Sequence, residues 1–508
     1  MTRATLWAIA LWASTVLPAF AQEPGHGHAL QTEKLGTVHF ATSCNPAIAP
    51  QFDRAVALLH SFEFGASIRG FNDVLAADSS CAMAYWGLAL SRWGNPMAAG
   101  NRPPALLQQG GKWSETGVRL GARATDRERG YISAVAQLYD DVDHKDQPAR
   151  IAAYSQAMND LMMRQAADTE AKIFYAISLV AAASPSDKSY ANQLKAGKIL
   201  EDLWSVEPNH PGLAHYIIHT YDYPPLADKA RIAAERYAEI APSAAHALHM
   251  PSHTFTRVGM WKESVEANNH SMNVALGNGS IAEALHAADY DMYAYLQLGD
   301  YAAAKRILDS LPSLAARFDP NAVTGAAPPL AGYFALAAIP ARWALERGEW
   351  KEAASLQPKP TAYPYAEAMT YFARALGASR TGDFANASAS IDSLSAIHQR
   401  LSQKNEPYWA EQVAIQRLGA QAWLELAQGK KDDAVKLMRE AAAREDATDK
   451  SAVTPGPLAP AHELLGDMLI QLGQPTEADA EYRTTLKKEP NRRHSLQRLG
   501  RGAPNASD

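Results

Sequence analysis

A helical pattern that repeats about every 34 residues constrains the fold more than any other feature of this sequence. Apolar residues recur with the 3.6-residue period of amphipathic helices, whereas the long alternating runs that are typical of strands do not occur. Pro208 and Pro242, which end two successive units, lie 34 residues apart. Because one helix pair cannot bury its own apolar face, such a repeat predicts helix pairs that stack into a continuous array.

The clearest unit is APAHELLGDMLIQLGQPTEADAEYRTTLKKEPN, near the end of the chain. Gly466, Ala478, Tyr482 and Pro490 occupy the places where the 34-residue tetratricopeptide repeat (TPR) has a small residue, an alanine, an aromatic residue and a proline. The chain therefore resembles the TPR family. The resemblance implies an all-α fold, a right-handed superhelix (α-solenoid) of TPR-like helix pairs whose first helices line a concave surface. Weaker copies cover much of the chain, but residues 100–170 do not fit the repeat cleanly.

The start of the chain has the features of a secretory signal peptide. Arg3 supplies a positive charge, an apolar run follows, and Ala19-Phe20-Ala21 matches the cleavage rule. We expect cleavage after Ala21 and a secreted or periplasmic protein without a membrane span, because the apolar run is too short to cross a bilayer. The expected organisation is a signal peptide at 1–21, an extended segment at 22–48, a TPR-like array with the histidine cluster at 49–310, a second TPR-like array at 311–500 and a disordered tail at 501–508.

Cysteine content and charge exclude several classes of protein. Two cysteines in 508 residues rule out a disulfide-dense scaffold and a four-cysteine zinc module. In an oxidising compartment two lone cysteines tend to pair, so we expect a disulfide between Cys44 and Cys81. The 48 basic and 54 acidic residues give a net charge of −6, so we expect no nucleic-acid partner.

Histidines concentrate in the middle of the chain, where eight of the 16 lie between residues 210 and 286. His215 and His219 fall at positions 5 and 9 of one repeat, and His249 and His253 fall at the same positions of the next. His286 falls at position 2 of the unit after that. The TPR resemblance implies that these positions face the concave surface. Since residues four apart share one helix face, each pair presents two imidazoles to the same side.

Imidazoles that reach inward from helices about 8–10 Å apart can converge on one ion. A site with nitrogen and oxygen donors and no thiolate suits a divalent transition metal, namely Zn²⁺, Cu²⁺, Ni²⁺ or Fe. Asp222 and Asp289 are either carboxylate ligands or acceptors for imidazole N–H groups. The predicted metal ligands are His215, His219, His249, His253 and His286. The further candidates for ligand binding are His60, Asp222, His246, Arg257, Asp289 and Tyr290.

Pro251 lies between His249 and His253 and leaves two interpretations open. A proline inside a helix removes a hydrogen bond and kinks the helix, which would tilt the two imidazole rings relative to each other. Alternatively the helix begins at Pro251, a favoured first-turn residue, and His249 lies in a cap or loop. We favour the kinked helix.

Three functions are compatible with this pattern. The first is an exported protein that binds a metal ion, or a small ligand held through one, in the concave groove. The second is a metal-dependent enzyme, a hydrolase or oxidoreductase, in which Arg257 or Tyr290 stabilises developing charge. The third is an interaction scaffold with a protein partner, because TPR arrays mostly bind peptides or proteins. A water-sized open coordination position beside an enclosed pocket favours the enzyme, and a long open groove favours the scaffold. The 445–463 loop is expected to fold over the concave opening as a lid.

Overall fold

The computed structural model describes residues 33–98 and 100–500 of the chain. The expected signal peptide at 1–21, the first part of the expected extended segment at 22–48 and the expected tail at 501–508 lie outside these residues. The described residues from Lys34 to residue 500 belong to one folded unit. The expected boundary between two arrays, at residue 310, falls inside helix α15 (Tyr301–Arg317).

One helix follows another through the described residues, which contain no strand. The first helices are η1 (Pro46–Ile48), α1 (Ala49–His60), α2 (Phe64–Ala77), α3 (Ala82–Trp93), α4 (Pro104–Gly121), α5 (Asp126–Gln137), α6 (Gln147–Arg164), α7 (Thr169–Ala181) and α8 (Ala191–Trp204). The next are α9 (Pro211–Thr220), η2 (Ala227–Ala230), α10 (Arg231–Ile240), α11 (Ala245–His249), α12 (Pro251–Val258), α13 (Trp261–Gly277), α14 (Ile281–Leu298), α15 (Tyr301–Arg317) and α16 (Pro329–Glu346). The last are α17 (Trp350–Ser355), α18 (Pro364–Thr381), α19 (Phe384–Gln403), α20 (Pro407–Ala427), α21 (Lys431–Ala447), α22 (Ala461–Gln471), α23 (Pro475–Lys488) and α24 (Arg493–Arg498).

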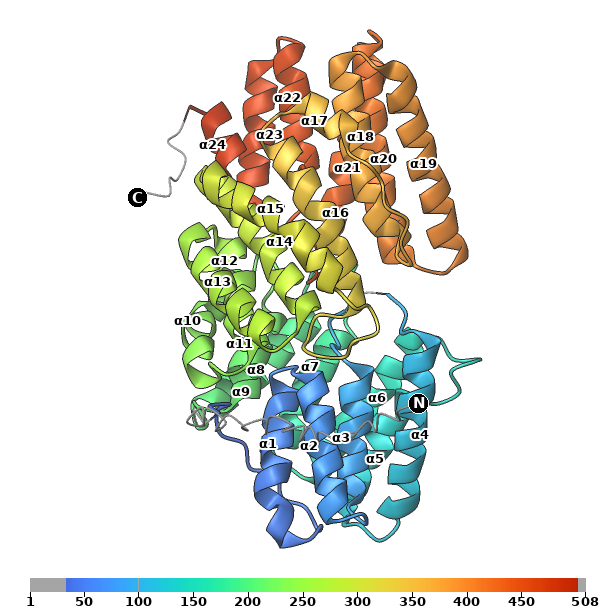
Figure 1. The fold of residues 1–508 in the computed structure, drawn as a ribbon, viewed down its shortest axis with the longest axis vertical. Coiled ribbons are helices and arrows are strands. Elements are labelled where there is room, and N and C mark those ends of the chain that lie inside the picture. Colours follow the sequence, from blue (N-terminus) through green and yellow to red (C-terminus); the bar gives the residue numbers. More distant parts are fainter. Residues whose placement is uncertain (1–32, 99, 501–508) are drawn as a thin grey trace, which may run out of the picture. The chain divides into compact units, whose positions relative to one another are not determined.

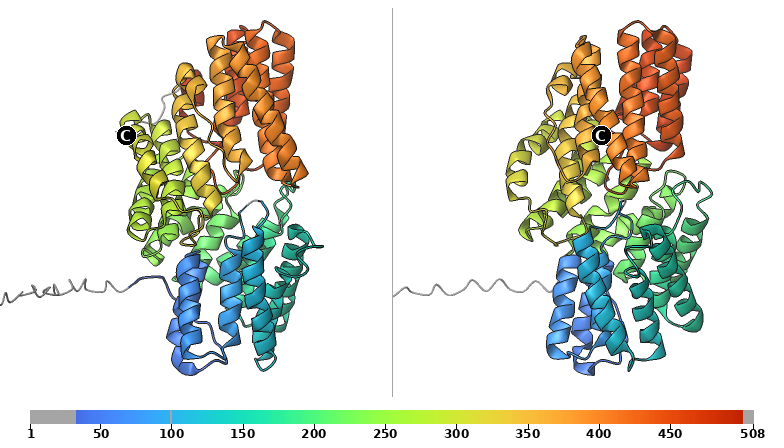
Figure 2. Two further views of the ribbon diagram at one scale, coloured as in Figure 1. Left: turned by 45° about the vertical axis from the view of Figure 1, so that its right-hand side comes forward. Right: turned by 90° about the vertical axis from the view of Figure 1, so that its right-hand side faces the viewer.

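Each helix packs mainly on helices one or two places away in the sequence (Figure 1). Helix α18, for example, packs on α19 and also on α20, the first helix of the next pair. Two further views show the same succession of helix pairs (Figure 2). Residues 100–170, which do not match the repeat, form α4, α5 and α6 and continue the stack. The prediction of an all-α solenoid of helix pairs is confirmed.

Small residues at the repeat positions allow this close packing. A Cβ atom on Gly466 of α22 would lie 2.6 Å from the ring of Tyr482 of α23, which is fully buried. A Cβ atom on Gly377 of α18 would lie 2.4 Å from the backbone oxygen of Trp350 of α17. Both distances are too short for a side chain, so glycine is needed where these helices meet.

A disulfide joins Cys44 and Cys81, as expected from the sequence. It ties the segment before α1 to the start of α3, across 37 residues of chain. Within the described residues, every helix is too short or too polar to cross a lipid bilayer.

The winding of the array brings the histidine-bearing helices together. Helix α1 packs on α9, although seven helices separate them in the sequence. Helix α9 in turn contacts α10 and α12, and α11 contacts both α12 and α14. The helices that carry the histidine cluster therefore surround one region in the interior of the array.

Candidate metal centre

Four helices bring six histidines into the interior. Each of the six side chains is at most 6% exposed. They are His215 and His219 on α9, His246 and His249 on α11, His253 on α12, and His286 on α14. All five predicted metal ligands are among them, together with His246, which the sequence placed among the further candidates.

The chain at Pro251 forms two helices, and the favoured prediction of one kinked helix is wrong. Because proline has no N–H, the helical bond to the preceding turn is missing, and α12 begins at Pro251. His249 is nevertheless the last residue of α11 and does not lie in a loop. Met250 between them keeps right-handed helical angles (φ −54°, ψ −34°). His249 and His253 therefore still face each other, with 3.1 Å between their Nε2 atoms.

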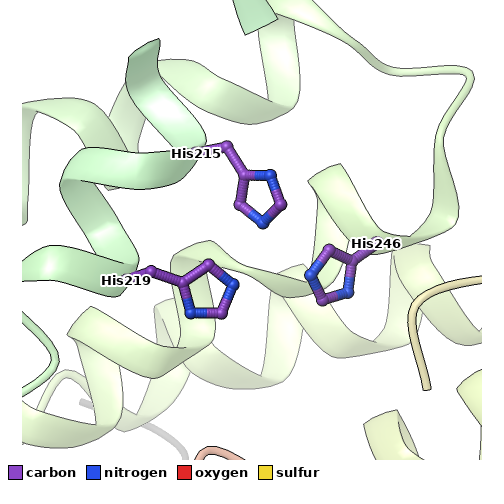
Figure 3. A group of neighbouring side chains, drawn as sticks. All are labelled: His215, His219 and His246. Atoms are coloured by element: carbon purple, nitrogen blue, oxygen red, sulfur yellow. The ribbon is translucent and has the colours of Figure 1, made fainter. Parts of the chain in front are cut away.

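His215, His219 and His246 form a first triad, whose rings turn toward the same space between α9 and α11 (Figure 3). One nitrogen from each ring lies within 4.8 Å of the others. Within the described part of the chain, none of the three Nε2 atoms has a hydrogen-bond partner. Three buried ring nitrogens without partners are costly, at about 1–3 kcal/mol each, so this arrangement is the form expected of ligands that share an ion.

Hydrogen bonds at Nδ1 hold two rings of the first triad in place. The Nδ1 of His215 donates to the backbone oxygen of His60 at 2.6 Å. The Nδ1 of His246 faces Glu283 Oε1 at 2.9 Å. A carbonyl or carboxylate oxygen only accepts, so the proton of each ring is on Nδ1 and the lone pair is on Nε2. Metal-binding histidines are typically oriented in this way, through the ring nitrogen that does not bind the ion.

Phe62 forms an apolar wall against the first triad. Its ring centroid lies 4.4 Å from that of His215, 5.5 Å from His219 and 5.6 Å from His246. Phe62 has a positive φ of 56°, which is costly for a residue with a side chain. The turn between α1 and α2 thus accepts backbone strain at the residue that covers the imidazoles, as happens at many functional sites.

His249, His253 and His286 form a second triad. The Nδ1 of His249 donates to Asn268 Oδ1 at 2.6 Å. The Nδ1 of His253 faces Asp222 Oδ2 at 3.0 Å. Their Nε2 atoms face each other, and the Nδ1 of His286 has no hydrogen-bond partner among the described residues. One nitrogen from each ring again lies within 4.8 Å of the others.

Burial favours the neutral form of five of these imidazoles. It lowers the pKa of His215, His219 and His249 well below the ordinary value of 6.5, and neighbouring imidazoles add to the effect. For the same chief reason, the pKa of His253 falls to about 4 and that of His286 to about 3. Neutral imidazole is the form that binds metal ions.

Asp222 lies behind the second triad as an ionised acceptor. Burial alone raises its pKa, but Lys450 and Arg257 bring the net value well below 3.8. Arg257 Nε donates to Asp222 Oδ1 at 2.8 Å, and Lys450 Nζ lies 3.3 Å from Oδ2. The carboxylate thus holds His253 through Nδ1, which is one of the two roles that the sequence left open for it.

Asp289 and Tyr290 were both predicted as candidates for ligand binding, and of the two Tyr290 lies beside the second triad, with its ring centroid 5.3 Å from that of His286. Asp289 is fully buried on α14 and pairs with Arg342 of α16 at 2.8 Å. Tyr290 OH lies 3.4 Å from His253 Nδ1 and donates to the backbone oxygens of Ala452 and Thr454. Asp289 therefore belongs to the packing of α14 on α16, and Tyr290 connects the second triad to a distant loop.

His60 belongs to a third cluster, with Glu170 and His210. Glu170 lies 2.9 Å from His60 Nε2 and 3.1 Å from His210 Nε2. Burial raises the pKa of Glu170, but the two imidazoles outweigh it and make the net shift downward. The other ring nitrogen of His60 bonds to Tyr216 OH at 3.1 Å. Since both nitrogens of His60 have partners, this cluster is a buried anchor, and His60 contributes to the first triad through its backbone oxygen.

Two loops cover the histidines. The cap loop, residues 448–460 between α21 and α22, is held by Arg342, which donates to Thr454, Gly456 and Pro457. The loop between α15 and α16, residues 318–328, is held by bonds from Gly65 N to Thr324 O and from Ala327 N to Glu283. A cavity of about 30 Å³ remains under these loops. It is lined by His219, His246, His253 and His286, by Asn95 and Ala98, and by residues 326–328, 330–331 and 451–453.

The sequence did not point to Phe62, Asn268 or Glu283. Glu283 lies three residues before His286, on the same face of α14, and that spacing could have identified it. Phe62 and Asn268 carry no such signal, because Phe62 reaches the histidines from the turn between α1 and α2 and Asn268 reaches them from α13. His210, the first histidine of the rich stretch, bonds to Glu170.

No protein-family model and no curated protein sequence matches the chain. Among solved structures, yeast Tom70 is similar, with 13% identity over 89% of this chain and 94% of Tom70, at a TM-score of 0.39. A monomeric mutant of IFIT1 with m7Gppp-AAAA is 10% identical over 87% of this chain and 95% of that chain, at a TM-score of 0.35. Cut9–Hcn1 of the APC/C is 9% identical over 88% of this chain and 95% of that chain, at a TM-score of 0.30. Likenesses at this level concern the arrangement of helices and carry no argument about the histidine centre.

Proposed function

We propose that this chain is an exported helical solenoid that binds a divalent transition metal ion through its buried histidine centre. The observation that carries the proposal is the first triad. Its three Nε2 atoms turn toward one another without hydrogen-bond partners in the described residues, while His215 and His246 are fixed through Nδ1. A bound ion would satisfy all three lone pairs at once.

The surroundings of the triad support an ion over a peptide as the ligand. Each of the six histidines is at most 6% exposed, and the cavity beside them holds only about 30 Å³. A cavity of that size has room for about one or two water molecules. A peptide would need an open groove along the inner helices, and at the histidines the cap loop and the α15–α16 loop fill that space.

The donor set narrows the choice of ion. Imidazole nitrogens suit Zn²⁺, Cu²⁺, Ni²⁺ and Fe, whereas Ca²⁺ and Mg²⁺ prefer oxygen ligands. The disulfide between Cys44 and Cys81 is compatible with an oxidising compartment outside the cytosol.

Measurement of the metal content of the purified protein tests the proposal. We expect at least one tightly held transition-metal ion per chain. The double variant His215→Ala/His253→Ala removes one ligand from each triad and should lose the metal. The matched control is His144→Ala, because the side chain of His144 is 80% exposed, and it should keep the full content.

A second measurement guards against loss of metal through unfolding. After treatment with a chelator, the wild-type protein should regain stability when the ion is added back, by about 2.7 kcal/mol at one hundred times the dissociation constant. A double variant that has the circular dichroism of a folded helical protein should show no such gain. Full metal content in the double variant, or no metal in the wild-type protein even after loading, would refute the proposal.

A further inference from the structure

We propose that the centre is dinuclear: each triad holds one copper ion, and a small anion such as hydroxide bridges the two ions in the cavity between the triads. This inference rests on the proposed function and adds to it the number of ions, their identity and the ligand that they share.

The second triad offers a set of lone pairs of its own. Asn268 donates through Nδ2 to the backbone oxygen of Ser264, so its Oδ1 faces His249 and accepts from Nδ1. Asp222 likewise accepts from the Nδ1 of His253. The Nε2 lone pairs of His249 and His253 therefore point at each other across 3.1 Å, an unfavourable contact unless they share a cation.

The spacing of these nitrogens fits one metal ion. Metal–nitrogen bonds of about 2.0–2.1 Å place two ligand atoms about 2.9–3.4 Å apart, for bond angles between a right angle and the tetrahedral angle. The 3.1 Å between the Nε2 atoms of His249 and His253 falls within this range. His286 brings the third donor, an Nδ1 atom without a hydrogen-bond partner in the described chain.

The two triads are direct neighbours. The ring centroids of His246 and His249 are 5.9 Å apart, and so are those of His219 and His253. The cavity is lined by His219 and His246 from the first triad and by His253 and His286 from the second. A ligand of one or two heavy atoms in this cavity can therefore contact an ion in either triad.

The ligands identify copper as the preferred ion. Iron and manganese pairs inside helical bundles are held largely by glutamates that reach the ions directly. Here the two carboxylates of the centre, Glu283 and Asp222, bind the outer Nδ1 atoms of His246 and His253. Six imidazole ligands with no carboxylate among them favour the ion at the top of the Irving–Williams order, which is Cu²⁺.

Charge explains why a bridging anion is expected. The imidazole ligands bring no negative charge. Of the two carboxylates of the centre, Asp222 is already matched by Arg257 and Lys450, which leaves Glu283. Two divalent ions would bring four positive charges into a buried region, which is unfavourable without anions nearby. An anion in the cavity would lower the net positive charge directly beside the two ions.

Copper loading of the chelator-treated protein tests the inference. After excess ion is removed, the wild-type protein should retain two copper ions per chain. His219→Ala disrupts the first triad and His286→Ala the second, so each variant should retain one. The electron paramagnetic resonance signal of the loaded wild-type protein should be weaker than its copper content requires, because bridged Cu²⁺ ions couple. Each variant should give the full signal of one isolated Cu²⁺, and His144→Ala should match the wild-type protein.

The outcomes separate this inference from the proposed function. One copper per wild-type chain, lost in both variants, would mean one shared ion, so the proposed function would stand and the dinuclear centre would fall. No bound metal of any kind would overturn both. Two ions with an uncoupled signal would overturn the bridge, and two tightly held zinc ions that copper does not displace would overturn the choice of ion. If His286→Ala does not fold, His249→Gln gives the same test from α11.

Discussion

Replacing His286 by glutamine should make the metal-free protein less sensitive to acid. Burial, with a smaller effect of nearby imidazoles, lowers the pKa of His286 from 6.5 to about 3 in the folded chain. As the pH falls below 6.5, the unfolded chain therefore takes up a proton on this residue while the folded chain does not. The free energy of unfolding then decreases by about 1.4 kcal/mol for each pH unit.

The size of the change in the free energy of unfolding depends on the pH interval over which it is measured. Between pH 6.5 and pH 5.0, His286 remains neutral in the folded protein, so it removes about 1.7 kcal/mol from the free energy of unfolding. Glutamine gains no proton in this interval. The other titrating groups are common to both proteins, so the difference between their pH profiles isolates this one residue. A constant offset between the two proteins at neutral pH does not affect the comparison.

Urea unfolding in the presence of a chelator, followed by circular dichroism at several pH values, gives the two profiles. We expect the profile of His286→Gln to be flatter than that of the wild-type protein by about 1.7 kcal/mol over this interval. His144→Gln is the control, because that side chain is 80% exposed in the folded protein, and its profile should run parallel to that of the wild-type protein. A profile of His286→Gln that also runs parallel would show that burial does not hold this imidazole neutral.

Three further predictions concern stability, each measured as the free energy of unfolding. Gly466→Ala places a methyl group 2.6 Å from the buried ring of Tyr482 and should cost about 1–3 kcal/mol. Gly277→Ala has no neighbouring atom within 4 Å and should stabilise the protein by about 0.5–1 kcal/mol. Equal effects of the two substitutions would contradict the close-packing argument. Reduction of the disulfide, which closes a 37-residue stretch, should cost about 3–4 kcal/mol, and unchanged stability in a reducing agent would count against it. Arg342→Ala leaves Asp289 buried without its partner and should cost about 3–5 kcal/mol. Arg129→Ala removes one partner of an exposed pair and should change the free energy of unfolding little. A similar small loss at both sites would contradict this account.

The repeat made the inner surface predictable from the sequence. Small residues such as Gly466 mark where helices pack closely, and from them the register of a unit can be counted. The same counting places the predicted metal ligands on the side of each helix that faces the interior. The structure brings these residues together because helix pairs of similar length stack with a regular offset.

Tertiary partners were not predictable in this way. Glu283 lies 37 residues after His246, and the backbone oxygen that fixes His215 lies 155 residues before it. Helical periodicity states which face of a helix a side chain occupies, but not which distant residue meets it. Asp289 illustrates the limit, since its partner Arg342 lies 53 residues further along the chain. The division of α11 from α12 at Pro251 depended on hydrogen bonds that the sequence left open.

If the histidine centre binds a metal ion as proposed, the cap loop would control the timing of uptake and release. Ala452, which accepts a hydrogen bond from Tyr290, lies 162 residues after it, so the histidine-bearing helices are synthesised long before the segment that encloses them. An ion would reach the imidazoles freely until that segment docks. Afterwards its residence time would be set by the rate at which the docked segment detaches, so exchange with the surroundings would be slow even for an ion that is only moderately well bound.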